Sequence, residues 1–410
     1  MTDLVCRGIV IIVLAVGCGP GPTPYNGSAG TPRSIIPDAG TNGTTDGGPA
    51  DAGISSDDIF RIAPHSPFPA LTFHKGLVLS SVKLVTITFA NYEYASDVEA
   101  LGDFLVGSDW MTAAGKDYGV GFGTHLAKVR LDEPAPTTIS DVQLQKKIVD
   151  WIAAGTVPPP EANANQVLYL VYFPSTTTVL DEASDPLCTG PLDGYHSTVK
   201  ANHDGTKYTI PYGVIAHCPQ ETSTNAQVTV LASHEFIEAC TDPTVTPTSG
   251  TGWFLDTPDT DSWPTNLEDA DLCERDHLRL GGFELTRAFS NSAAAQGISP
   301  CVPAVPGEIY FNVTADPTTK LQLAPGATAQ VTLTGWSTGP RNAWDLSTEI
   351  VGQFELQASL SASKIKNATT VTLTLTVPQS AMSGAEAVAK VWSGPVDFPT
   401  RYWPVGVRVK

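Results

Sequence analysis

The segment from Ser233 to Pro243 reads SHEFIEACTDP and contains the pattern His234-Glu235-x-x-Glu238. This pattern differs from the H-E-x-x-H zinc signature in having glutamate at the position of the second histidine. Residues four apart on a helix lie about 40° apart around its axis, so His234 and Glu238 can reach one metal ion. Glu235 is rotated by about 100° and can act as general base toward a water beside that ion. The motif predicts a metal-dependent, peptidase-like hydrolase.

A hydrolytic zinc site usually has three protein ligands and one open position, so this motif needs a third ligand. We expect Glu268 to supply it, with His234 and Glu238 as the other two. The alternative candidates are His196, Asp242 and Asp271. Asp271 could instead orient another ligand, and His196 could be an ordinary hydrogen-bonded loop histidine. One histidine with two carboxylates is a hard ligand set, so zinc is expected while calcium and manganese stay open.

Several segments before and around the motif have the patterns of regular elements. Apolar or β-branched runs predict strands at residues 82–90, 167–173 and 208–216, and helical spacing predicts helices at 97–106, 140–154 and 226–240. The last of these helices carries the motif. This succession favours an α+β, zincin-like domain over residues 57–304.

The helix expected at residues 140–154 has the clearest signals. Ser140 and Gln143 have the spacing of a capping box, and Gly155 follows the end of the helix. The apolar side chains expected to face the core are Val142, Ile148, Val149 and Ile152.

The composition and patterning of the sequence change after Pro303. Residues 305–410 are rich in Val, Thr, Leu and Ser, with strand-like alternation at 309–313, 329–333, 369–377 and 388–392. About a hundred residues of short, regularly spaced strands are typical of an all-β immunoglobulin-like sandwich. No catalytic constellation is evident there, so a structural or binding module is expected.

The N-terminal segment has the features of an export signal. Residues 8–17 are an apolar run, too short to span a bilayer, that ends in small residues directly before Cys18. We expect a lipoprotein signal peptide at residues 1–17 and lipidation of Cys18; the alternative is an ordinary signal peptide. Residues 18–56 lack large apolar side chains and predict a disordered Gly/Pro/Thr-rich linker. The expected location is a bacterial outer membrane or cell surface, with the lipid as sole membrane anchor.

Five cysteines lie beyond the expected signal peptide and Cys18. In an oxidising compartment they would form two disulfides and leave one thiol. The expected pairs are Cys188–Cys218 and Cys273–Cys301, which leaves Cys240 buried on the motif helix.

The net charge of −19 argues against nucleic-acid binding, which needs a basic surface. A peptide or a cell-wall polymer is the expected substrate.

Three blocks of this sequence resemble the exordium/phosphate-induced protein 1 family and its bacterial relatives. They are Cys188 with Gly194-Tyr195-His196, the stretch from Ser233-His234-Glu235 to Thr241-Asp242-Pro243, and Glu268-Asp269-Ala270-Asp271-Leu272-Cys273-Glu274, with Asp269 departing from the family pattern. Ser290-Asn291 and Cys301-Val302 extend the similarity, which spans residues 75–302. The resemblance implies an extracellular or cell-wall-associated protein. It also implies that His234, Glu235, Glu238, Glu268 and Asp271 form one site.

The resemblance implies no particular reaction. The second hypothesis is therefore a non-catalytic envelope binding protein in which the same residues hold a structural metal or form a hydrogen-bonded polar cluster.

Overall fold

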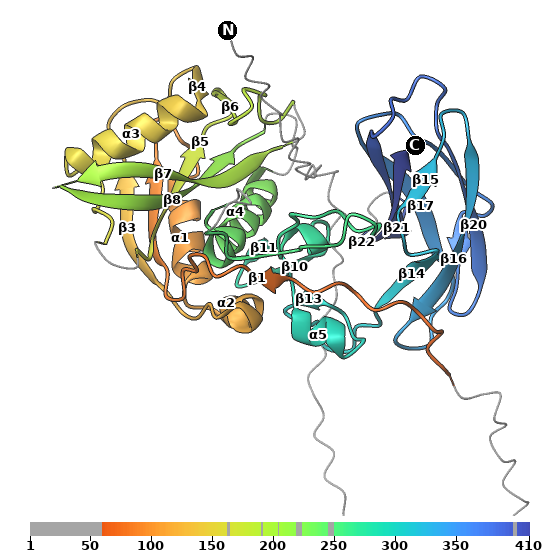
Figure 1. Cartoon of the computed structure of the whole chain (residues 1–410). Coiled ribbons are helices and arrows are strands. Elements are labelled where there is room, and N and C mark those ends of the chain that lie inside the picture. Colours follow the sequence, from red (N-terminus) through yellow and green to blue (C-terminus); the bar gives the residue numbers. More distant parts are fainter. Residues whose placement is uncertain are drawn as a thin grey trace, which may run out of the picture.

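The computed structural model describes residues 60–161, 165–189, 192–203, 205–218, 224–244, 250–396 and 400–410. The expected signal peptide (1–17), the linker (18–56) and Cys18 lie outside the described residues. The described chain is mostly β structure. It forms two lobes, one built on a mixed sheet with helices and one made of two facing sheets (Figure 1).

The first lobe is built on a five-stranded sheet with the strand order β3-β2-β5-β8-β7. Its strands are β2 (Lys83–Thr88), β3 (Thr124–Arg130), β5 (Val167–Phe173), β7 (Gly194–His203) and β8 (Thr206–Ala216). All neighbours pair in parallel except the edge strand β7, which is antiparallel to β8. The central strand β5 is apolar and buried at every position, because helices cover both faces of the sheet.

Helices cover the two faces of this sheet unequally. The helices α1 (Ala95–Leu105), α2 (Asp109–Gly115) and α4 (Thr224–Thr241) pack on one face, and α3 (Asp141–Ala153) packs on the other. The helices expected from the sequence at 97–106, 140–154 and 226–240 correspond to α1, α3 and α4. The short α2 was not predicted.

The N-terminus of α3 has the expected capping box between Ser140 and Gln143. The expected apolar face was partly wrong, because Val142 is 74% exposed. Leu144 and Trp151 are buried in its place. Val142 is the second residue of the helix, and its side chain faces solvent.

The second lobe is a β-sandwich. One sheet has the order β14-β16-β20-β18 and the other β15-β22-β21-β17-β19. The strands of the first are β14 (Phe311–Asp316), β16 (Thr328–Ser337), β18 (Gln357–Leu360) and β20 (Thr370–Thr376). The strands of the second are β15 (Leu321–Leu323), β17 (Trp344–Gly352), β19 (Lys364–Ile365), β21 (Glu386–Gly394) and β22 (Arg401–Val409). The four strands expected in this region are present as β14, β16, β20 and β21.

Short ladders and turns lie outside the large sheets of the two lobes. Two-stranded ladders are formed by β1 (Thr72–Phe73) with β9 (Trp253–Phe254), β4 (Thr138–Ser140) with β6 (Thr178–Leu180), β10 (His277–Leu280) with β11 (Phe283–Thr286), and β12 (Ala288–Phe289) with β13 (Cys301–Val302). The 3-10 turns η2 (Lys116–Tyr118) and η3 (Asp271–Cys273) and the helix α5 (Asn291–Ala295) complete the described elements.

The sandwich packs directly against the segment that contains η3. Lys390 on β21 donates to Glu274 over 2.7 Å, and each of these side chains is only 1% exposed. Beside them, Arg275 lies over the ring of Trp392 at 4.0 Å and pairs with Glu349 at 2.8 Å. These contacts hold the η3 segment against the sandwich. The buried Lys390–Glu274 pair compensates its own charges, since either charge alone would be costly to bury.

Both expected disulfides, Cys188–Cys218 and Cys273–Cys301, are present, and Cys240 is a buried free thiol. Two disulfides indicate an exported or extracellular protein. None of the described helices is long and apolar enough to cross a bilayer.

Candidate metal centre

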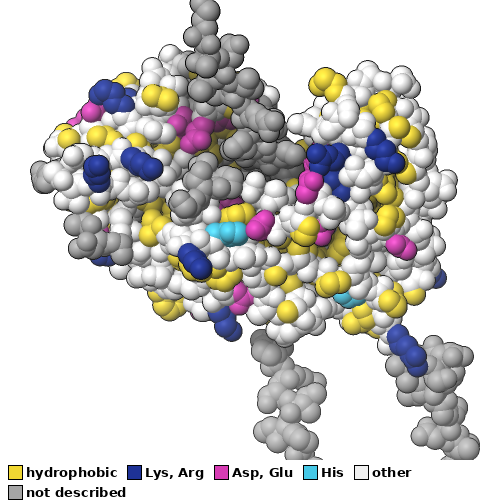
Figure 2. All heavy atoms as spheres, in the orientation of Figure 1, with side chains coloured by type: hydrophobic (Ala, Val, Ile, Leu, Met, Phe, Trp, Pro, Cys, Tyr) yellow, Lys and Arg dark blue, Asp and Glu magenta, His cyan; other side chains and the backbone are white. Residues whose placement is uncertain are grey.

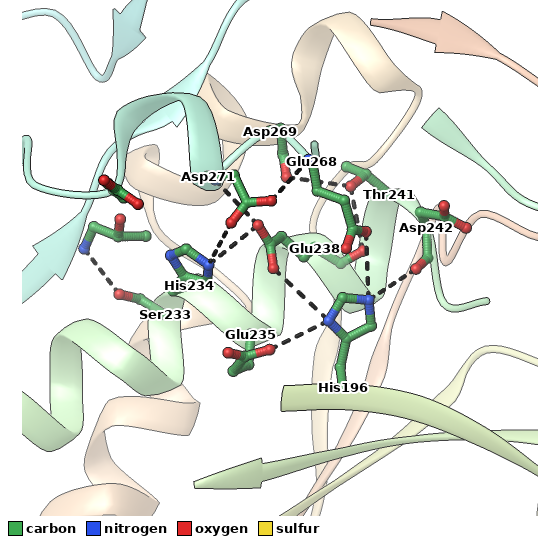
Figure 3. A network of polar contacts seen from close by, with 12 residues as sticks. His196, Ser233, His234, Glu235, Glu238, Thr241, Asp242, Glu268, Asp269 and Asp271 are labelled. Carbon is green, nitrogen blue, oxygen red and sulfur yellow. Dashed lines mark hydrogen bonds and ion pairs between the residues drawn. The ribbon is translucent and has the colours of Figure 1, made fainter. Parts of the chain in front are cut away.

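Three separate parts of the first lobe bring histidines and carboxylates together (Figure 3). The edge strand β7 contributes His196, the helix α4 contributes His234, Glu235 and Glu238, and the turn leading into η3 contributes Glu268, Asp269 and Asp271. Strand alternation, helical spacing and the hydrogen bonds of a turn set the direction of the side chains in these three parts.

On β7, successive side chains point to opposite faces of the sheet. The Tyr195 hydroxyl donates to Asp141 Oδ1 of α3 over 2.8 Å, on one face. His196 therefore points to the other face, where α4 packs, and its Nδ1 lies 3.2 Å from Glu235 Oε2.

On α4, the i, i+4 spacing places His234 and Glu238 side by side, as expected. His234 Nε2 lies 3.2 Å from Glu238 Oε1. The helix is buried from residue 227 to its end, so these polar side chains face the protein interior rather than solvent. Both glutamates of the motif are therefore buried, Glu235 at 5% and Glu238 at 3% exposure.

The turn before η3 completes the cluster through backbone and side-chain bonds. The Asp271 backbone N–H donates to Glu238 Oε1 over 3.1 Å, and Asp271 Oδ2 accepts from the backbone N–H of Glu268 at 3.1 Å. Asp271 Oδ1 is thereby held 3.7 Å from His234 Nε2. Asp271 thus faces the motif histidine directly.

Glu268, the expected third ligand, belongs to the same cluster but faces the other histidine. Its Oε1 lies 3.4 Å from His196 Nε2. The same Nε2 donates to the backbone carbonyl of Asp242 over 3.0 Å. The carboxylate of Asp242 is turned away and accepts from the backbone N–H groups of Gly252 at 2.7 Å and Thr244 at 3.3 Å.

Within the described residues, these side chains form two sets whose ligand atoms lie within 4.8 Å of one another. One set is His234, Glu238 and Asp271, and the other is His196, Glu235 and Glu238. Glu238 belongs to both, and Figure 3 shows it between the two histidines. A further set of Cys188, Asp193 and Cys218 holds no metal, since its cysteines form a disulfide.

The cluster has a large excess of buried negative charge. Its acids are Glu235, Glu238, Asp242, Glu268, Asp269 and Asp271, against two histidines. Among the ion pairs of the described residues, none joins a lysine or arginine to these acids. The buried atoms Glu268 Oε1, Asp269 Oδ2 and His234 Nδ1 also have no hydrogen-bond partner. Buried carboxylates need protons or a cation, so the cluster could hold a metal ion.

Without a cation, burial and mutual charge shift the pKa values of the acids and histidines in this cluster. Burial raises the pKa of Glu238 to about 7, against the opposing effect of His234. Burial also raises the pKa of Glu268 and of Asp269 well above the usual range. Burial alone would lower the pKa of His196 and His234, but the surrounding carboxylates outweigh it and raise both well above the usual value.

On the face of the molecule in Figure 2, lysines and arginines occur singly or in small groups. The expectation that the protein does not bind nucleic acid stays a prediction. Of the two carboxylates nearest the surface of the cluster, Asp271 is 16% and Glu268 10% exposed at the side chain. The most exposed carboxylates of the cluster thus belong to the segment that leads into η3.

The sequence predicted most residues of this site but did not identify Asp269 as one of them. Asp269 is fully buried and receives a hydrogen bond from the Thr241 hydroxyl over 3.4 Å. The sequence marked it as a departure from a family pattern and as one acid of a run expected to be a solvated loop. Its place between two other candidate acids was the one signal that could have revealed it.

No family model matches this chain, and no curated protein matches it. Among solved structures, domains 4 and 5 of the S-layer protein SbsC align at 19% identity and a TM-score of 0.19, covering 27% of this chain and 59% of that one. A nucleoside hydrolase-related hypothetical protein from Saccharophagus degradans aligns at 9% identity and a TM-score of 0.26, covering 80% of this chain and 100% of that one. This chain thus spans less than two thirds of the S-layer fragment. Both TM-scores are too low to support a function.

Proposed function

We propose that the cluster binds a divalent metal ion and that the first lobe is a metal-dependent, peptidase-like hydrolase with a zincin-like α+β arrangement. One observation carries this proposal. His234 Nε2, Glu238 Oε1 and Asp271 Oδ1 converge, with separations of 3.2 and 3.7 Å from the histidine nitrogen. Neighbouring ligand atoms of a tetrahedral zinc ion lie about 3.3 Å apart, given bonds of about 2 Å.

In this proposal His234, Glu238 and Asp271 hold the ion. Asp271 takes the place first assigned to Glu268, because its carboxylate faces His234 while that of Glu268 faces His196. The bound ion would supply Lewis-acid chemistry and lower the pKa of a coordinated water. Zinc suits the histidine and the tetrahedral spacing, while the surplus of carboxylates also suits calcium or manganese.

Glu235 is the proposed general base. It lies on the same helix as both motif ligands, and its Oε2 is 3.2 Å from His196 Nδ1. A carboxylate so placed can take a proton from water and return it to a leaving amine. His196 orients this carboxylate, and the β7 strand fixes His196.

The two disulfides, and the expected signal peptide and Cys18 anchor, support an exported lipoprotein on a bacterial outer membrane or cell surface. A peptide or a cell-wall polymer is the proposed substrate, and it would approach from the side of Glu268 and Asp271, the most exposed acids of the cluster. Membership of the exordium/phosphate-induced protein 1 family stays a prediction on the three sequence blocks.

A structural metal site is the second candidate, favoured by the deep burial of both histidines, which are 3% and 4% exposed. A structural ion is enclosed by protein ligands, whereas a catalytic ion keeps one position open. The two candidates therefore differ in whether small molecules reach the ion.

The test compares wild type with Glu235→Gln on a library of quenched fluorescent peptides, with metal content measured on the same samples by plasma mass spectrometry. We expect the variant to lose hydrolysis by about a hundredfold or more and to keep metal at the His234 set. Glu133→Gln, which alters an acid paired with Lys147, is the matched control and should leave both unchanged. Unchanged activity in Glu235→Gln would remove the mechanism. Bound metal without hydrolysis in wild type would leave the structural metal site as the remaining candidate function.

The choice between Asp271 and Glu268 is tested by a second pair of variants. Asp271→Asn should weaken metal binding at the His234 set strongly, and Glu268→Gln only slightly. The reverse order would return Glu268 to the ligand set.

A further inference from the structure

We propose that this centre holds two divalent ions, the second bound by His196, Glu235 and Glu238, with Glu238 bridging the pair. The inference rests on the proposed metal-dependent function and refines it. It would make Glu235 a ligand of the second ion as well as a residue essential to the reaction.

The position of Glu238 is the first argument. Its Oε1 lies 3.2 Å from His234 Nε2, and its Oε2 lies 3.8 Å from His196 Nδ1. The two oxygens of one carboxylate are thus divided between two histidines. Among the described residues, no single ligand set includes both histidines. One ion therefore cannot use both at ordinary bond lengths without rearrangement, whereas two ions about 3.5–4 Å apart can share a carboxylate.

The hydrogen bonds of His196 are the second argument. Its Nε2 lies 3.0 Å from the backbone carbonyl of Asp242. A carbonyl only accepts, so Nε2 carries the proton and donates it. This arrangement is common for metal-ligating histidines, because it fixes the ring and leaves the other nitrogen free to bind. Nδ1 then directs its lone pair at the Glu235 and Glu238 carboxylates, 3.2 and 3.8 Å away, which requires a proton or a metal ion between them.

The charge of the cluster is the third argument. A single divalent ion offsets the negative charge of only two of the six acids. Glu268 Oε1 and Asp269 Oδ2 are buried and have no hydrogen-bond partner, and Glu268 is 7% exposed. A second ion brings the charge closer to balance inside a lobe where no lysine or arginine of the described residues pairs with these acids. Two carboxylate-bridged ions also match the centres of several hydrolase classes.

The test is the number of ions bound per chain. The full exported protein is stripped with a chelator and dialysed against Mn²⁺ or Zn²⁺, and bound metal is counted by plasma mass spectrometry. We expect two ions in wild type, one in His196→Ala and one in Glu235→Gln. Wild type loaded with Mn²⁺ should also show an exchange-coupled spin-resonance spectrum that His196→Ala lacks. His125→Ala removes another buried histidine, one paired with Asp103, and should retain two ions.

The outcomes separate this inference from the function on which it rests. One ion in wild type and one in His196→Ala would overturn the second ion and leave the single-ion hydrolase standing. No ion in wild type would overturn both. If His196→Ala does not fold, His196→Gln replaces it, with circular dichroism as the check. Two ions persisting in folded His196→Gln and in Glu235→Gln would also refute the assignment.

Discussion

Removing metal should make this protein sensitive to alkaline pH, and Glu238 allows the effect to be estimated. In the metal-free protein, burial raises the pKa of Glu238 from 4.5 to about 7. A carboxyl whose folded pKa exceeds its unfolded pKa contributes stability at low pH that is lost as pH rises. Between pH 5 and pH 8.5 this one group should lower the free energy of unfolding by about 2–3 kcal/mol. For a protein of this size that corresponds to a fall in Tm of roughly 3–4 °C.

The assay is thermal unfolding at both pH values, with and without chelator, for wild type and Glu238→Gln. The variant is neutral at every pH, so the comparison cancels other titrating groups such as His277, whose pKa burial lowers to about 4. We expect chelated wild type to lose stability relative to chelated Glu238→Gln as pH rises. Metal-loaded wild type should be protected, because metal ions replace the missing protons. Parallel Tm values for the two chelated proteins would refute a raised pKa of Glu238 in the metal-free protein.

Three further predictions concern the supports of the centre. Lys390→Met should destabilise the protein by about 3–5 kcal/mol by leaving Glu274 buried without its partner, and adding Glu274→Gln should recover much of the loss in chemical denaturation. Replacing Cys273 and Cys301 by serine should cost about 2–5 kcal/mol and weaken metal binding, measured by calorimetry, because the ligand turn adjoins this disulfide; unchanged affinity would show that the turn is held by other contacts. Cys240 should resist thiol reagents in the native protein and react only after unfolding, so rapid native labelling would contradict its burial.

Elements with strong local signals were predicted from sequence with good accuracy. The capping box at Ser140 and the apolar run of β5 are properties of a few adjacent residues, and the structure confirmed both. The strands β17 and β22 were missed. Trp344–Gly352 is only partly buried over much of its length, and Arg401–Val409 contains a proline, so each departs from clean alternation.

The candidate site was predictable where its residues share one helix. The pairing of His234 with Glu238 follows from helical spacing alone. The pairing of His196 with Glu235 depends on β7 lying at the edge of the sheet beside α4, and no spacing in the sequence encodes that. The choice between Asp271 and Glu268 depends on the backbone of one turn, which also needs the tertiary fold.

The contacts between the sandwich and the η3 segment bear on the proposed export of the protein. Asp271, which completes the proposed metal set around His234, belongs to a segment that contacts Lys390 and Trp392 of the sandwich. If the protein is exported from its N-terminus, as proposed, His196 and His234 cross the membrane before the sandwich does. The proposed metal centre can then be completed only once the sandwich has crossed, so the proposed hydrolase would stay inactive until that point.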